Sequence, residues 1–139
     1  MASAVCNSFK TEVLGGTHDL DTDVIKLALY TSAASLSAST TAYSSTNEVS
    51  SSGTNYTAGG NTLAGAAITL DGSTAIVDFT DTAWTTATFT ARYGLIYNSS
   101  KTNKAIAVLD FTTDQTATNG TFTVVFPTAN ASNAIIRLS

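Results

Sequence analysis

Residues 88–97 read TFTARYGLIY, and this stretch decides the fold class. Its apolar side chains recur at every second position, and threonine or arginine takes the alternate positions over most of its length. A period of two is typical of a β-strand with one face buried and the other in solvent. Threonine, tyrosine and isoleucine also favour strands, because β-branched and aromatic side chains pack well on a pleated surface. The stretch therefore predicts one long strand.

The same signals recur on both sides of this strand. Residues 24–29 alternate in the same way. The turn sequence Asp71-Gly72-Ser73 separates the runs 67–70 and 75–79, which predicts a β-hairpin. Turn residues such as Asn119-Gly120 separate the remaining runs. These predict three further strands, at residues 104–111, 121–126 and 134–138.

Seven short strands with turn residues between them predict an all-β fold, a compact antiparallel β-sandwich that is Ig-like or jelly-roll-like. The length of 139 residues fits a single domain, 1–139. Before the first strand, apolar side chains spaced four apart and a following Gly15-Gly16 predict a short N-terminal helix over residues 3–14. The side chains expected in the core are Ile25, Leu27, Leu29, Val77, Phe79, Val108, Phe122 and Val124.

Charge and composition exclude several classes of partner. Charged residues make up 12% of the chain and the net charge is −4. Only six scattered lysines and arginines are present, so we expect no nucleic-acid partner. No apolar run is long enough to cross a bilayer, and the N-terminus lacks the features of a secretory signal. We therefore expect no membrane partner and synthesis in a reducing cytoplasm. With 26 threonines and 16 serines, the surface is suited to being covered by a partner.

A long polar loop over residues 32–60 ends in NEVSSSGTNYTAGG, residues 47–60. Loops of this length in compact domains are usually functional or disordered, and aromatic side chains in this one argue against full disorder. Two interpretations stay open. In one, the loop drapes over an open end of the sandwich and pins itself there. In the other it binds a partner, with Tyr56 as the anchor and Asn55 and Thr57 beside it.

Candidate catalytic residues are few. His18 lies beside Asp19, but no nucleophile can be assigned, and we expect an exposed histidine in a turn. The single cysteine, Cys6, is expected to be a small core residue. Asp19, Asp21 and Asp23 have the spacing that opens a calcium loop but lack its glycine and glutamate, so a turn is preferred. Asp78 and Asp81 could face each other across a turn, as the acids of a glycosidase do. We predict no catalytic, cofactor or metal site and no enzymatic activity.

Several motifs lie in a characteristic order along nearly the whole chain. They are DTDVIKLALYT (residues 21–31), Asn47-Glu48-Val49, GTNYTAGGNTLAG (53–65), DFTDTAWTTATFTARYGLIYN (78–98), Leu109-Asp110-Phe111, NGTFTVVF (119–126) and Ile136-Arg137-Leu138. In this order the chain resembles a family of small virion proteins of tailed bacteriophages. The segment YTAGG is the most distinctive piece. The longer Ser/Ala-rich tract of residues 32–45 departs from the family pattern.

The resemblance implies a structural protein located in the virion, on the capsid surface, without catalytic residues. The implied role is a head decoration or cement protein, and its partners would be the major capsid protein and neighbouring copies of itself. A homotrimer would suit the local threefold positions of such a shell. Two alternatives remain: a neck or tail component, such as an adaptor or fibre-attachment module, and, more distantly, a carbohydrate-binding β-sandwich.

Overall fold

Strands dominate the structure, a computed structural model that describes residues 2–139. The elements are β1 (Ala2–Val5), α1 (Asn7–Leu14), β2 (Ile25–Tyr30), β3 (Asn61–Thr62), β4 (Ala67–Asp71), β5 (Thr74–Asp78), β6 (Thr82–Asn98), a 3₁₀ turn (Ser99–Lys101), β7 (Lys104–Val124) and β8 (Ile136–Leu138). They form two antiparallel sheets, with strand orders β1-β7-β6-β2-β3 and β4-β5-β8. The predicted all-β, sandwich-like fold with a short N-terminal helix is confirmed.

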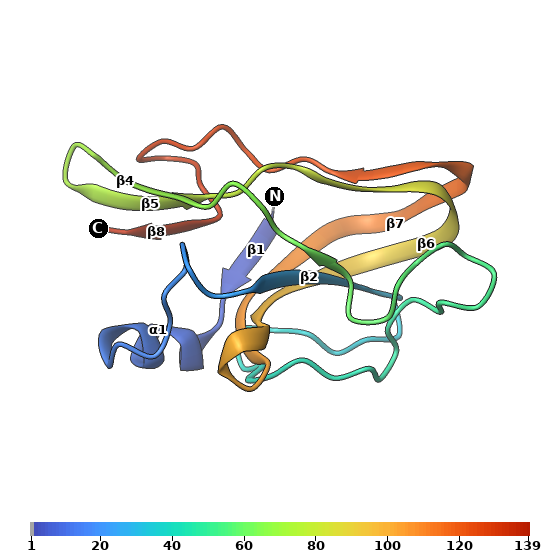
Figure 1. The fold of residues 1–139 in the computed structure, drawn as a ribbon, viewed down its shortest axis with the longest axis horizontal. Coiled ribbons are helices and arrows are strands. Elements are labelled where there is room, and N and C mark those ends of the chain that lie inside the picture. Colours follow the sequence, from blue (N-terminus) through green and yellow to red (C-terminus); the bar gives the residue numbers. More distant parts are fainter. Residues whose placement is uncertain (1) are drawn as a thin grey trace.

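The longest feature is the antiparallel ribbon of β6 and β7, which bends back over itself so that its two arms lie in different layers (Figure 1). The sequence predicts separate strands at 104–111 and 121–126, and this is wrong. Both belong to β7, a single strand of 21 residues. Asn119 has a positive φ of 48° and Gly120 pairs with Ala87. These residues therefore form an irregularity that bends the ribbon and do not reverse the chain.

An aromatic cluster fills the concave side of this bend. Phe122 contacts Phe89 with ring centroids 4.9 Å apart, Trp84 at 6.1 Å and Phe111 at 6.3 Å. Tyr56 joins the cluster, with its ring centroid 5.7 Å from that of Phe89. Such tilted and edge-on contacts are the favourable arrangements for aromatic pairs. All eight predicted core residues are buried: Ile25, Leu27, Leu29, Val77, Phe79, Val108, Phe122 and Val124.

The N-terminal segment differs from its prediction. The helix expected over residues 3–14 begins only at Asn7, because residues 2–5 form β1 and pair with residues 107–110 of β7. The N–H of Cys6 continues this ladder to the carbonyl of Ile106 at 2.9 Å. Residues 2–5 therefore form a strand despite their helical spacing, because the edge of β7 provides partners for their backbone hydrogen bonds. The predicted end at Gly15 is confirmed.

The predicted hairpin around Asp71-Gly72-Ser73 is also confirmed. Asp71 pairs with Thr74, which leaves a two-residue loop, and Gly72 has a φ of 64°. A glycine with positive φ at the first loop position suits the twist of the two strands. The predicted strand 134–138 is shorter, since β8 covers only residues 136–138 and pairs with β5. Among the described residues, the single α-helix has eight residues, and no helix is long and apolar enough to cross a membrane.

Replacing Phe122 with alanine tests the aromatic core. We expect the free energy of unfolding to fall by about 3–5 kcal/mol, because a buried ring is removed and a cavity remains. Chemical denaturation measures the change. Thr123→Ala, at the exposed neighbouring position, is the matched control and should change stability by less than about 0.5 kcal/mol. Similar stabilities of both variants would contradict the position of Phe122 in the core.

Candidate functional site

Glu48 is the acceptor at the centre of a hydrogen-bond cluster in the long polar loop. Its Oε1 accepts from the Tyr56 hydroxyl and from the Gly59 N–H, both at 2.7 Å. Its Oε2 accepts from the Tyr43 hydroxyl, also at 2.7 Å. We call Glu48, Tyr43, Tyr56 and Gly59 the Glu48 clasp. One carboxylate therefore joins three points of a segment that contains no strand of its own.

The clasp is fixed to the sheet through β2 and β6. The Tyr56 hydroxyl accepts a hydrogen bond from the Leu29 N–H at 2.9 Å, and the N–H of Val49 donates to the Leu29 carbonyl at 3.0 Å. The Tyr97 hydroxyl, on β6, donates to the carbonyl of Gly59 at 2.7 Å. Polar groups of the loop and of the sheet thus satisfy one another in a region from which water is largely excluded.

Gly59 and Gly60 are required by the close approach of the loop to β2 and β6. Both have a positive φ, 90° and 82°. A Cβ on Gly60 would overlap the carbonyl oxygen of Leu27, and one on Gly59 would lie 3.3 Å from the Tyr97 hydroxyl. Only glycine adopts this backbone conformation without strain and leaves room for the neighbouring chain. The distinctive YTAGG segment is therefore explained by Tyr56 and the two glycines together.

Burial keeps the tyrosines around Glu48 in their neutral form. Desolvation is the main cause that raises the pKa of Tyr56, Tyr43 and Tyr30 well above the usual range, and the nearby Glu48 carboxylate adds to it. Burial likewise raises the pKa of Tyr97 to about 12. These hydroxyls therefore act as hydrogen-bond donors over the physiological pH range and not as acids or nucleophiles.

The three predicted contact residues, Tyr56, Asn55 and Thr57, differ in their exposure to solvent. Tyr56 is 3% exposed and its ring lies in the core of its own chain in this conformation. This position agrees with the interpretation in which the loop packs against its own sandwich. Asn55 and Thr57, the other two proposed contact residues, are exposed. The Asn55 side-chain amide donates to the carbonyl of Thr85. The predicted partner contact at Tyr56, Asn55 and Thr57 stays a prediction.

Sequence reasoning missed Glu48 as the centre of this site. A usable signal was present, since Glu48 is the only charged residue between Lys26 and Asp71. A lone carboxylate in a tract of more than forty neutral residues is unusual when followed by a tyrosine and two glycines. Tyr43 and Tyr97 could not be assigned in this way, because their approach to the clasp depends on the folding of β2 against β6.

His18 belongs to a second polar cluster, near the start of β2. The sequence predicts an exposed histidine, but its side chain is fully buried. Its Nε2 lies 3.1 Å from Glu12 Oε1, and its Nδ1 lies 3.0 Å from the Asn98 side-chain nitrogen. Asn98 also donates to Asp23 at 2.8 Å. Both ring nitrogens are thus occupied within the chain, and Asp19 is not the partner of His18.

Several of the remaining candidate groups make contacts within the chain. Cys6 is buried as predicted, and burial raises its pKa to about 11, so it is not a thiolate nucleophile at neutral pH. The Asp19–Asp23 segment forms a turn, in which the Asp23 N–H donates to the Asp19 carbonyl. Asp81 accepts from the Phe126 N–H at 2.8 Å. Within residues 2–139, no group of three or more His, Cys, Asp or Glu side chains is placed to hold a metal ion.

Comparison of the chain with models of protein families, with curated proteins and with solved structures finds no match.

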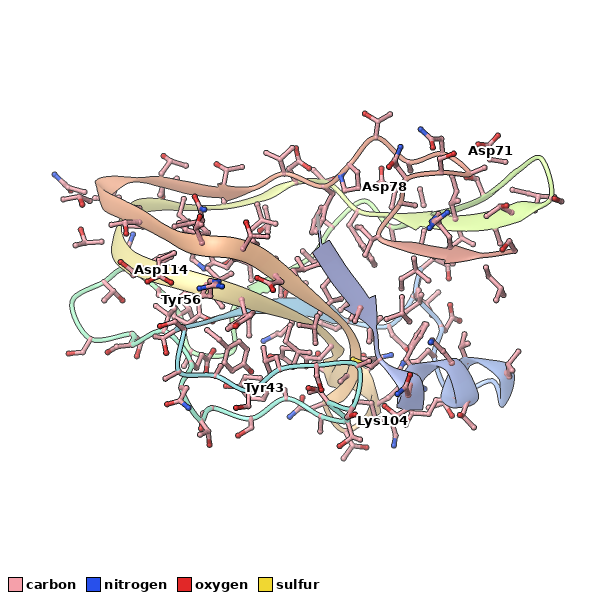
Figure 2. All side chains as sticks on the ribbon, turned by 180° about the vertical axis from the view of Figure 1, so that it is seen from behind. Tyr43, Tyr56, Asp71, Asp78, Lys104 and Asp114 are labelled. Atoms are coloured by element: carbon pink, nitrogen blue, oxygen red, sulfur yellow. The ribbon has the colours of Figure 1, made fainter. Side chains whose placement is uncertain are left out.

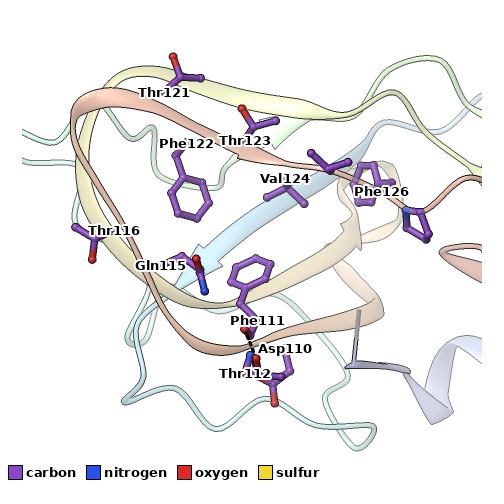
Figure 3. Close-up of a pocket in the computed structure, with 12 residues that line it drawn as sticks. Asp110, Phe111, Thr112, Gln115, Thr116, Thr121, Phe122, Thr123, Val124 and Phe126 are labelled. Atoms are coloured by element: carbon purple, nitrogen blue, oxygen red, sulfur yellow. Dashed lines mark hydrogen bonds between the residues drawn. The ribbon is translucent and has the colours of Figure 1, made fainter.

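Two of the hollows at the surface adjoin the ribbon and the helix. One, of about 790 Å³, follows the bend of β7, where Phe111 and Phe122 lie between its two arms under a rim of Thr112, Gln115 and Thr121 (Figure 3). The other, of about 580 Å³, is an apolar cleft between α1 and the β4-β5-β8 sheet. The clasp residues Tyr43 and Tyr56 lie toward the opposite end of the molecule from Asp71, on the β4–β5 hairpin (Figure 2).

Replacing Tyr56 with phenylalanine tests the clasp. The ring stays in the core, but the Leu29 N–H and Glu48 each lose a buried hydrogen-bond partner. We expect the free energy of unfolding to fall by about 1–3 kcal/mol. Tyr93→Phe is the matched control, because Tyr93 is half-buried and its hydroxyl makes no hydrogen bond within the described residues. A Tyr56→Phe variant as stable as this control would show that the clasp does not hold the loop.

The His18 cluster predicts a loss of stability in acid. Burial acts to raise the pKa of Glu12, but hydrogen bonds from His18 and Lys104 outweigh it and lower that pKa below its usual 4.5. The hydrogen bond from Asn98 lowers the pKa of Asp23 below its usual 3.8. The stability contributed by both carboxylates is therefore complete above these usual values and is lost as the pH falls through the lowered ones.

Urea unfolding at about pH 6 and about pH 2.5 measures this loss. We expect Asp23→Asn to lose less stability across this window than the wild-type chain does, because one of the titrating groups is removed. An equal or greater acid-dependent loss in the variant would contradict the assignment of Asp23.

Proposed function

We propose that this chain is a structural protein of a tailed-bacteriophage virion, a decoration or cement protein that binds the outer surface of the head. Its partners are the major capsid protein and neighbouring copies of itself. The proposal rests on the resemblance of the motif order and on one structural observation. The exposed side chains of the central ribbon over residues 82–91 and 115–124 are mostly short and uncharged.

The exposed threonines of the β6–β7 ribbon carry this observation. They are Thr85, Thr86, Thr88, Thr90, Thr112, Thr113, Thr116, Thr118, Thr121 and Thr123. No residue between Thr82 and Ala91 or between Gln115 and Val124 is charged. Some of these hydroxyls already pair across the ribbon, as Thr90 and Thr116 do at 2.9 Å.

Such a surface favours close packing against a shell. A threonine loses less side-chain entropy on burial than a lysine or glutamate does, so covering it with a partner costs less. Uncharged faces also avoid repulsion between identical neighbours, whereas like charges brought together at an interface are unfavourable. Many copies bound side by side on one capsid would need both properties.

The loop held by the Glu48 clasp supports the same function. Ordering a flexible loop on binding costs roughly 1–2 kcal/mol per residue of backbone entropy. The clasp orders residues 43–59 before any partner arrives. The exposed residues Asn55 and Thr57 are therefore presented on a fixed backbone, which reduces the cost of a contact there.

The number of copies in purified virus particles tests the proposal. A head decoration protein should be present in on the order of hundreds of copies per particle, because its binding sites repeat with the symmetry of the shell. Its ratio to the major capsid protein gives this number. Quantitative mass spectrometry with labelled peptides measures this ratio. About six or twelve copies would indicate the neck or tail instead. Absence of the chain from particles would contradict any structural role in the virion.

A further inference from the structure

The outer edge of β4 is the most regular free strand edge in the described part of the chain. All five of its residues are exposed, with Ile68 at 49% and Leu70 at 70%. β4 pairs only with β5, and it borders its sheet on the side away from α1, with β5 and β8 lying between (Figure 1). Its backbone groups therefore face solvent along one side.

The two-residue loop of the hairpin determines which backbone groups these are. Asp71 and Thr74 flank the loop and form the first hydrogen-bonded pair, and such pairs alternate with non-hydrogen-bonded ones. Asp71, Thr69 and Ala67 consequently direct their N–H and C=O groups toward β5. Ile68 and Leu70 direct theirs outward. The free edge thus offers two donors and two acceptors, centred on Thr69.

We propose that two copies of this chain pair antiparallel through β4, about a two-fold axis at Thr69. In this register Ile68 of one copy lies opposite Leu70 of the other, and Leu70 lies opposite Ile68. Both pairs are at positions whose N–H and C=O groups point outward, so four hydrogen bonds close without any change in the hairpin. The three-stranded sheets then join into one six-stranded sheet. The inference does not depend on the proposed virion function.

The side chains of β4 fit this arrangement on both faces. Ile68 and Leu70 share the apolar face, so the four exposed side chains of the two copies cover one another. On the other face, Thr69 meets Thr69 of the second copy, a cross-strand pair that is favourable in sheets. At the ends of the contact Ala66 lies opposite Gly72, where small residues present no obstacle.

The positions of the carboxylates favour a specific contact between two β4 edges over non-specific association. Two copies of a chain with a net charge of −4 repel each other, so a contact between them must keep carboxylates apart. Asp71 is the one ionisable residue of β4, and in this register it lies opposite Ala67. Its carboxylate already accepts a hydrogen bond from the Ala131 N–H at 2.6 Å. A second copy therefore brings no like charge directly against β4.

Other free edges in residues 2–139 are shorter or irregular. β3 has two residues, β8 has three, and β1, the outer strand beside β7, has four. The edge of β7 is interrupted at Thr112 and Asn119, which have positive φ values of 66° and 48°. Proteins usually protect a free edge by a lysine, a proline, a bulge or a short length. β4 has none of these protections.

Replacing Leu70 with lysine tests the contact. The side chain is mostly exposed in one copy, so the melting temperature of the monomer should barely change, but two charges would meet the apolar pairs of the dimer. We expect light scattering and sedimentation, from about 10 µM to about 1 mM, to show a dimer for the wild-type chain and an at least about tenfold weaker association for Leu70→Lys. Leu138→Lys is the matched control, because Leu138 is 61% exposed on β8, at the other edge of the same sheet. This variant should still form the dimer.

Cysteine cross-linking tests the register itself. Thr69 would lie opposite its own copy at a Cα distance of about 4.5 Å, within the range that a disulfide spans. The native Cys6 is fully buried and does not compete. Mild oxidation should therefore convert Thr69→Cys to a covalent dimer. Ser73→Cys is exposed on the same hairpin, but the two copies of residue 73 would be about 27 Å apart, so it should stay uncrosslinked.

Three results would overturn the proposal: a wild-type monomer over the whole concentration range, a trimer unaffected by Leu70→Lys, or Thr69→Cys cross-linking no faster than Ser73→Cys. A trimer would instead favour the homotrimer predicted from the low charge and the hydroxyl-rich surface.

Discussion

The bend of the β6–β7 ribbon around its aromatic cluster is the constraint on which the rest of the structure depends. Because the ribbon folds back over itself, one pair of strands supplies both layers and encloses Phe89, Phe111 and Phe122 between its arms. Where the ribbon bends, the strand on the outside of the bend needs more residues than its partner. Between the pairs Tyr93–Asp110 and Ala91–Gln115, β7 has four residues where β6 has one.

That one residue is Arg92, which lies opposite the extra segment of β7. Its Nε is 3.6 Å from Asp110 Oδ1, and its Nη1 is 3.9 Å from Asp114 Oδ1. The two carboxylates are half-exposed, so these ion pairs add little stability. They bracket the irregular segment on both sides, and the apolar burial of Phe111 and Phe122 supplies the energy that keeps the ribbon bent. The charges therefore fix the shape of the bend more than its stability.

The sequence predicts those features of the structure that depend on residues close together in the chain. The strand at TFTARYGLIY, the Asp71-Gly72-Ser73 turn and the apolar core positions follow from local patterns, and each is confirmed. The expected alternation of buried and exposed side chains holds only at residues 88–91, since residues 94–97 are all buried. The extent of β7 and the strand at residues 2–5 are not local. Asn119-Gly120 fits a turn or a bulge equally well, and only the partner strand decides between them. Tyr43 and Tyr97 were missed for the same reason, because they approach Glu48 only after β2 and β6 are in place.

A scarcity of charge links the clasp, the threonine surface and the free edge of β4. With six lysines and arginines in 139 residues, the chain has few side chains with which to protect an edge, and none of them lies on β4. An exposed, regular edge is an aggregation hazard for a protein that works alone. The hazard disappears if the edge is covered in the working state, and a buried edge favours neutral residues there because a buried lysine would be costly. Low charge and an unprotected β4 are thus both compatible with the proposed assembly, in which neighbouring chains would cover the strand edges and hydroxyl-rich faces.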